Sequence, residues 1–252
     1  MRQPLDLANP RLRKLAAALA PTYVRVSGTW ANSTYFHDAD TPAPATPPPG
    51  FGGILTRQQW RGVLDFARAT DARLITSFAV SDGVRDNHGV WTSEQARKLA
   101  AFTKASGGVI AAAELFNEPN FAAMGGAPKG YDEAAYGRDF AVFRRFAREA
   151  LPGMLILGPG SVAEAVPLAS GLSGLRTTEM LKATGRGVDA FSYHFYGSVS
   201  KRCGGMGGTS QTSPEAALTP EWLEPHGSRY GLLRPAARPV RTGQTALAHG
   251  NG

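Results

Sequence analysis

The stretch ELFNEPN (residues 114–120) decides how the fold is interpreted, and it directly follows the apolar run Val109–Ala113. A short apolar run of this kind is typical of a strand buried in a parallel sheet. Pro119 cannot continue a central strand, so we expect the strand to end where Asn117 and Glu118 stand. The triplet Asn-Glu-Pro therefore predicts a carboxylic acid held at the mouth of a parallel barrel.

Glu118 has two interpretations on these residues alone. It can protonate a leaving oxygen if its surroundings favour the protonated form near neutral pH. Asn117 would then lie beside it as a hydrogen-bond donor to a sugar hydroxyl. The alternative is an acidic turn after a strand, in which Glu118 is merely solvated.

Three segments of the chain resemble glycoside hydrolase family 79, the heparanase and β-glucuronidase family. Residues 9–29 are similar to the family's "P-x-L-R-x-L" helix that leads into "Y-x-R-x-G-G-T". Residues 114–120 match its Asn-Glu-Pro strand end, and residues 188–196 are similar to its "V-D-x-x-x-x-H-x-Y" strand. The segments also agree in order and spacing, and the resemblance covers roughly residues 5–223.

The resemblance implies a (β/α)8 TIM-type barrel and retaining hydrolysis by two carboxylates about 5–5.5 Å apart. Glu118 would be the general acid/base, and Asn117, His194 and Tyr196 would bind a carbohydrate substrate, such as a glycan that contains uronic acid. For His194 and Tyr196, packing and hydrogen bonding behind the site are the alternative. No cofactor is implied, and no metal-ligand spacing is present. Family members are often extracellular or membrane-associated, so localisation stays open.

The order of elements predicts an α/β chain with alternating helices and strands. A closed barrel needs eight strands. We expect the first strand of the family before Met1 and the last ones after residue 230, so that the barrel of residues 1–223 is incomplete. The predicted strands are 23–27, 73–80, 109–116, 154–158 and 188–196, and the predicted helices are 10–20, 56–70, 92–106, 131–151 and 167–184.

Local signals set three of the predicted helices. Leu12, Leu15 and Leu19 form one apolar stripe on the helix at 10–20. Thr56 is the expected cap of the second helix, and Thr92 lies near the start of the third, close to a capping box. Residues 38–53 hold five prolines and are expected to be a loop.

Composition permits this interpretation without requiring it. The chain has 252 residues, of which 42% are hydrophobic, and a net charge of +7. No tight cluster of basic residues appears, so we expect no nucleic-acid partner, whereas a basic cleft for an acidic sugar remains open. The single cysteine, Cys203, excludes an internal disulfide framework. No signal peptide and no long apolar run are present, so stable membrane insertion is not expected.

The pattern of apolar residues changes after Leu223, and residues 224–252 show neither strand nor helix periodicity. When Ala237–Gly252 are back-translated and the frame is shifted by one base, the DNA can read RDRFEPGKPLWLTET. This segment is similar to the family's strand that carries the nucleophile, and its glutamate codon straddles those of Gly250 and Asn251. We therefore expect a frameshifted, poorly ordered tail without the nucleophile; the alternative is a disordered tail rich in arginine and proline.

Several other residues carry weaker expectations. Gly28–Trp30 can line the floor of the site, although a turn after a strand explains Gly28 equally well. Asp82 and Asp86 follow a strand, but solvated loop charges are the favoured interpretation. Residues 204–208 are rich in glycine and lack the lysine of a phosphate-binding loop, so a flexible loop is expected. Two functions stay open: a glycosidase, and a catalytically dead remnant or non-catalytic carbohydrate-binding partial barrel.

Overall fold

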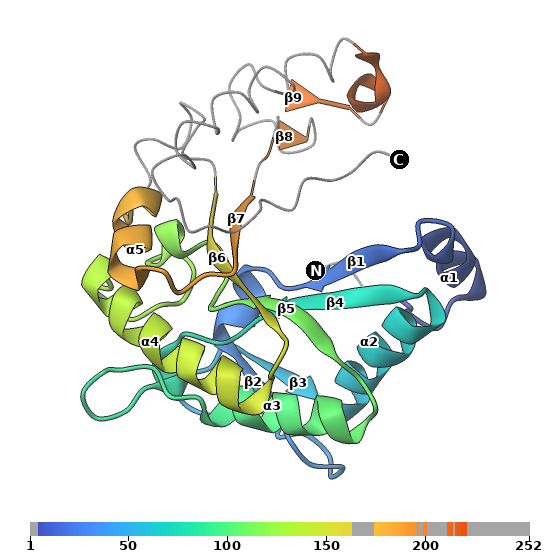
Figure 1. Ribbon diagram of the computed structural model, residues 1–252. Helices are drawn as coiled ribbons and strands as arrows, with labels where there is room; N and C mark the ends of the chain where they lie inside the picture. Colours follow the sequence, from blue (N-terminus) through green and yellow to red (C-terminus); the bar gives the residue numbers. More distant parts are fainter. Residues whose placement is uncertain are drawn as a thin grey trace.

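The centre of the molecule is a parallel sheet of five strands that curls into half of a barrel (Figure 1). The computed structural model describes residues 5–162, 174–194, 196, 199–200, 211–213 and 215–220. Neighbouring strands pair in the order β1-β4-β5-β6-β7, and every pairing is parallel. The strands are β1 (Thr22–Val26), β4 (Ala72–Ser77), β5 (Ile110–Glu114), β6 (Leu155–Val162) and β7 (Ala190–His194).

Helices connect successive strands and cover the outer face of the sheet (Figure 1). Thr56 and Gln59 begin α2 with a complete capping box, in which each side chain bonds the backbone of the other. The α-helices are α1 (Pro10–Ala17), α2 (Arg57–Ala69), α3 (Glu94–Ala105), α4 (Glu133–Ala150) and α5 (Thr177–Thr184). Short 3-10 turns occupy Thr29–Ser33, Asp82–Val84, Pro119–Phe121 and Ala216–Leu218.

The hydrophobic core lies between the sheet and these helices, and aromatic side chains dominate it. Phe140, Phe143 and Phe146 of α4 are each at most 1% exposed. Phe143 and Phe146 pack edge-on against Trp91, with ring centroids 6.2 Å apart in both pairs. Because burial of a large apolar side chain stabilises a fold by about 1.5–3 kcal/mol, this cluster fixes α4 against the sheet.

A buried ion pair fastens the loop after β4 to α4. Arg85 donates to Asp139 over 2.5 Å, and the two side chains are 5% and 2% exposed. Asp139 also accepts from the backbone N–H of Trp91 and from the hydroxyl of Tyr131. The remaining guanidinium nitrogens of Arg85 donate to the carbonyl oxygen of Val80. Every charge is thus paired, as burial at this depth requires.

The structure confirms the predicted α/β class and all five predicted strands, which form one parallel sheet. It also contains strands that the sequence analysis missed. They are β2 (Thr34–His37) and β3 (Gly53–Thr56), which pair with each other, and β8 (Val199–Ser200) and β9 (Gln211–Thr212), which form a second small pair.

Three details of the helices correct the predictions. The first helix ends at Ala17, short of the predicted residue 20, and its apolar stripe is largely exposed: Leu15 is 61% exposed, and Leu19, beyond the helix end, is 71% exposed. Ser93, not Thr92, precedes α3, since the Thr92 hydroxyl donates to the carbonyl oxygen of Val84 instead. Of the helix predicted at 167–184, Thr177–Thr184 form α5 and residues 174–176 are not helical, whereas residues 167–173 lie outside the described residues.

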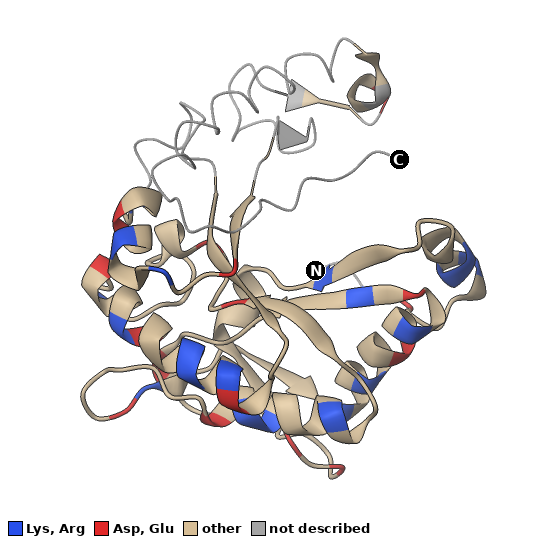
Figure 2. Ribbon diagram, viewed as in Figure 1, with Lys and Arg blue, Asp and Glu red and all other residues tan. Residues whose placement is uncertain are grey.

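Charged side chains of both signs are distributed over the outer helices (Figure 2). Many form pairs along or between helices, such as Lys98 with Glu94 and Arg97 with Glu149. In the described part of the chain, no helix combines the length and the apolar character needed to cross a bilayer. The predictions for residues 204–208, Cys203 and the tail at 224–252 lie outside the described residues.

Candidate functional site

Glu118 stands just beyond the carboxyl end of β5 in a left-handed backbone conformation, with φ 52° and ψ 59°. This conformation is uncommon for a residue with a side chain, and such strain clusters at functional sites. The turn continues into the 3-10 segment that begins at Pro119, which cannot extend the strand. The Glu118 side chain is 18% exposed, so it is largely enclosed but reachable.

Two buried asparagines hold the turn from both sides. The Asn32 side chain pairs with both backbone groups of Asn117, with N–O distances of 2.9 Å for each hydrogen bond. Asn120 pairs in the same way with Val162 at the end of β6, over 2.7 and 2.9 Å. Both asparagines are fully buried. They therefore replace the sheet hydrogen bonds that are lost where the strands end, and they fix the backbone on which Glu118 stands.

Five side chains from the carboxyl ends of β1, β5 and β7 form one hydrogen-bonded cluster, and His194, the last residue of β7, lies within it. Its Nδ1 lies 3.1 Å from Oε1 of Glu118, and its Nε2 lies 3.3 Å from Oε1 of Glu114. Arg25 on β1 donates through Nη2 to Oε2 of Glu114 over 2.7 Å and to Oδ1 of Asn117 over 2.9 Å. The cluster lies at the carboxyl ends of the strands, where sites form in barrels of parallel strands.

The charges of this cluster shift the pKa values of two of its members. Burial alone would lower the pKa of His194, but its hydrogen bonds to Glu114 and Glu118 outweigh burial and raise the pKa to about 8. Burial alone would raise the pKa of Glu114, yet His194 and Arg25 together bring it below the ordinary value. Near pH 7 the cluster therefore holds a cationic imidazole beside an ionised Glu114.

The structure brings together three of the four predicted site residues. Glu118 and His194 are in direct contact, and Asn117 shares Arg25 with Glu114. Asn117 is only 3% exposed, and its amide nitrogen lies 3.5 Å from the hydroxyl of Thr29. Tyr196, the fourth, is 63% exposed. Partial burial and the charge of Glu118 raise the pKa of Tyr196.

The weaker candidates lie elsewhere or play structural parts. Asp82 begins a 3-10 turn and is exposed. Asp86 accepts hydrogen bonds from the backbone of His88 and Val90, which lowers its pKa and closes its own loop. Trp30 is 52% exposed and lines a hollow beside the site.

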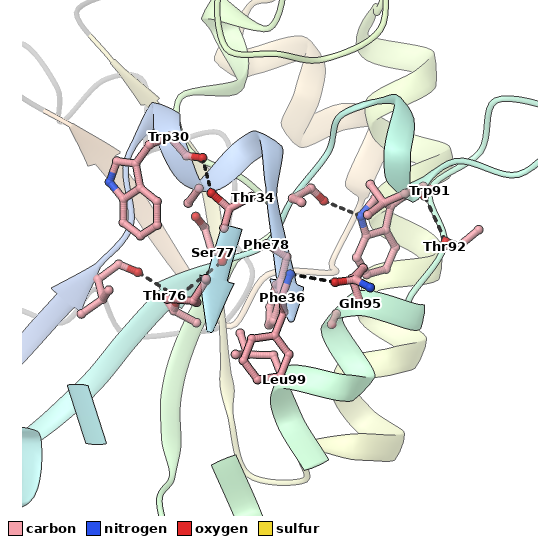
Figure 3. A pocket seen from close by; sticks show the side chains of 16 residues that line it. Trp30, Thr34, Phe36, Thr76, Ser77, Phe78, Trp91, Thr92, Gln95 and Leu99 are labelled. Carbon is pink, nitrogen blue, oxygen red and sulfur yellow. Dashed lines mark hydrogen bonds between the residues drawn. The ribbon is translucent and has the colours of Figure 1, made fainter. Parts of the chain in front are cut away.

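That hollow lies beneath Trp30, between β4 and α3, and Figure 3 shows its lining. Its free volume is about 40 Å³, which is room for one or a few water molecules. An organic ligand occupies a pocket of roughly 300–1,000 Å³. A larger hollow of about 680 Å³ lies at the opposite end of the strands, beside Tyr23, Val109 and Leu155. Neither hollow contains Glu118, so the chemistry of the cluster, not cavity size, identifies the candidate site.

Sequence reasoning missed Arg25, Glu114 and Asn32 as members of the site. Arg25 and Glu114 lie inside two segments that were singled out, yet nothing in a local pattern pairs residues 89 positions apart. A carboxylate at the end of the apolar run at 109–116 was the available signal, because a buried charge needs a partner, and Arg25 lies in another predicted strand.

No group of three or more His, Cys, Asp or Glu side chains in the described ranges is arranged to hold a metal ion. Comparison with known proteins gives no family: neither a protein-family model nor a curated protein matches the chain.

Proposed function

We propose that this chain is the barrel portion of a retaining glycoside hydrolase of the heparanase and β-glucuronidase type, with Glu118 as general acid/base. The proposal includes a TIM-type barrel, of which the five-stranded sheet would be the larger part. One observation carries it: Glu118 lies in a strained turn at the carboxyl end of β5, in contact with His194 at the carboxyl end of β7.

The surroundings of Glu118 support a role in proton transfer. A general acid must reach the leaving oxygen, and Glu118 is partly exposed, whereas Glu114 is 2% exposed. His194 gives Glu118 a hydrogen-bonding partner that can itself carry a proton. Tyr196 is exposed beside it and is the proposed contact for the sugar.

In this proposal, Asn117 can offer a sugar fewer hydrogen bonds than a free amide, because part of its side chain already has a partner. Its oxygen accepts from Arg25, and its amide nitrogen donates to the Thr29 hydroxyl over 3.5 Å, which leaves one N–H for a sugar hydroxyl. Arg25 is one third exposed and adds a positive charge to this end of the sheet. A positive charge here supports a substrate that carries a carboxylate, such as a uronic acid.

Retaining hydrolysis needs a second carboxylate as nucleophile. Glu114 is the other carboxylate of this cluster, but both of its oxygens are engaged, one by Arg25 and one by His194. It cannot attack a sugar from that position. We propose that the nucleophile is the glutamate encoded in the shifted reading frame, at the codons of Gly250 and Asn251.

The engaged state of Glu114 also favours a second candidate function for the chain as written. Without a nucleophile, the polypeptide would be a catalytically dead remnant or a carbohydrate-binding partial barrel. It would keep the polar cluster but form no glycosyl-enzyme intermediate.

The experiment compares the chain as written with a frame-restored form that is extended by the upstream codons of its gene. Both are assayed on aryl β-glucuronides and on a panel of other aryl glycosides. We expect turnover by the restored form only, and loss of that turnover in Glu118→Gln. Turnover by the chain as written that depends on Glu118 would overturn the proposal. A genomic sequence in which no single shift opens the predicted frame would overturn it as well.

A further inference from the structure

Glu114 is a buried carboxylate that the proposed reaction leaves without a role. It is the last residue of β5, stands four residues before Glu118 and is 2% exposed. A charge at this depth costs free energy unless partners compensate it. Glu114 has two such partners, Arg25 at 2.7 Å and His194 at 3.3 Å.

The backbone of β6 makes room for this carboxylate. Gly160 lies at a shift in the pairing of β6 with β7, with φ 75°, a conformation that favours glycine. A Cβ atom at Gly160 would stand 2.7 Å from Oε1 of Glu114, closer than such contacts occur. The irregularity in β6 and the missing side chain at Gly160 therefore leave the space that the Glu114 carboxylate fills beside His194.

His194 faces an acceptor at each of its ring nitrogens, Glu118 at Nδ1 and Glu114 at Nε2. A neutral imidazole has one N–H and can donate to only one of them, whereas an imidazolium can donate to both. In the described part of the chain, Arg25 on β1 is the other charged group that acts on the ring, and Tyr196, two residues after His194, senses the charge of Glu118. The positive charge of Arg25 destabilises a positive charge on the ring. The two carboxylates must therefore supply the interactions that stabilise the imidazolium.

We propose that Glu114 is a positioning residue that keeps a second proton on the His194–Glu118 pair, ready for transfer to Glu118. At rest the proton sits on Nδ1 of His194 and is donated to the Glu118 carboxylate. Before the glycosidic bond breaks, it crosses the 3.1 Å hydrogen bond to Oε1 of Glu118 and protonates that carboxylate. The imidazole is then neutral, and its remaining N–H stays on Nε2 and donates to Glu114. The pair still holds the same number of protons, and Glu118 is now the acid. Glu118 then gives this one proton to the leaving oxygen and becomes a carboxylate again.

The catalytic consequence of this arrangement rests on the proposed function, whereas the proton on His194 does not. Its test is therefore a titration of the free protein without substrate. The probe is the pair of ring ¹⁵N signals of His194 in the ¹⁵N-labelled full chain, assigned by their loss in His194→Asn. In the unsubstituted chain we expect both ring nitrogens to be protonated at pH 7, with a midpoint near pH 8.

In Glu114→Gln we expect that midpoint to fall by at least about one pH unit, a tenfold weaker hold on the proton. The matched control is Glu149→Gln, in which an exposed glutamate loses its charge and the His194 midpoint stays in place. An unchanged midpoint in Glu114→Gln would overturn the inference, and so would a His194 in the unsubstituted chain that titrates at its ordinary value.

Glu118→Gln provides a second variant if Glu114→Gln does not fold. Its His194 midpoint should stay above 6.5, because Glu114 still faces Nε2. A fall of the midpoint to 6.5 or below would mean that Glu118 alone keeps the second proton on His194, and it would refute the positioning role of Glu114. Absence of glycoside turnover by the frame-restored form, together with the expected titration, would reject the proposed function and leave this inference standing.

Discussion

Replacement of Asp139 by alanine tests how the loop after β4 is held to α4. Its carboxylate accepts from Arg85, from the hydroxyl of Tyr131 and from the backbone of Trp91, at 2.5, 2.7 and 2.9 Å. The substitution leaves a guanidinium that is 5% exposed without its counter-charge. Breaking a buried ion pair from one side costs about 3–5 kcal/mol, because the remaining charge stays out of water.

For a domain of this size, about 1 kcal/mol lowers the melting temperature by about 2–4 °C. Asp139→Ala should therefore melt roughly 6–20 °C lower than the unsubstituted chain. Urea unfolding followed by tryptophan fluorescence and circular dichroism gives the free energy of unfolding directly.

The matched control for Asp139→Ala is Glu149→Ala. Arg97 and Glu149 also stand 2.5 Å apart, but their side chains are 45% and 52% exposed. An exposed pair contributes about 0–1 kcal/mol, since water replaces the lost partner. If Asp139→Ala and Glu149→Ala lower the unfolding free energy equally, burial does not determine how much the Arg85–Asp139 pair stabilises the fold, and the reasoning fails.

Two further predictions concern the site. Asn32→Ala should cost roughly 2–6 kcal/mol, because it leaves the buried N–H and C=O of Asn117 without partners; a loss below 1 kcal/mol in urea unfolding would mean that the turn holds itself. Stability should also depend on pH. The pKa of His194 is raised from 6.5 to about 8, so its contribution of about 2 kcal/mol is complete below pH 6.5 and is lost as the pH rises through 8. The pKa of Glu114 is lowered, so its contribution is present above pH 4.5 and is lost on acidification. The urea midpoint should thus be highest between these limits, and His194→Asn should flatten its alkaline fall; parallel curves for the two proteins would refute this.

Strands that are short apolar runs bounded by turn residues were predictable. Residues 109–116 are the clearest case, since the alanines and isoleucine end at a proline that no central strand accepts. The same reasoning placed Glu118 at the end of its strand and α2 after Thr56, whose cap depends on a residue only three positions away. Signals that act over a few residues are visible in the sequence.

The parts that depend on distant residues were not predictable. Glu114 and His194 are 80 positions apart, and only the parallel pairing of β5, β6 and β7 brings them together. The predicted helix at 10–20 shows the opposite failure, because an apolar stripe in the sequence does not guarantee burial: Leu15 on α1 is exposed, and Leu19 lies beyond the end of the helix. Strands β2 and β3 have four residues each, too few for an alternating pattern to stand out.

The central claim is that Glu118 is the group that gives a proton to the leaving oxygen. It is tested most directly by the dependence of kcat/KM on the leaving group in the frame-restored form and its Glu118→Gln variant, with aryl β-glucuronides whose phenols differ in acidity. Poor leaving groups need the proton, so the variant should lose about 10²–10⁴-fold on them and far less on strongly acidic phenols. An equal loss across the series, or none, would contradict the account.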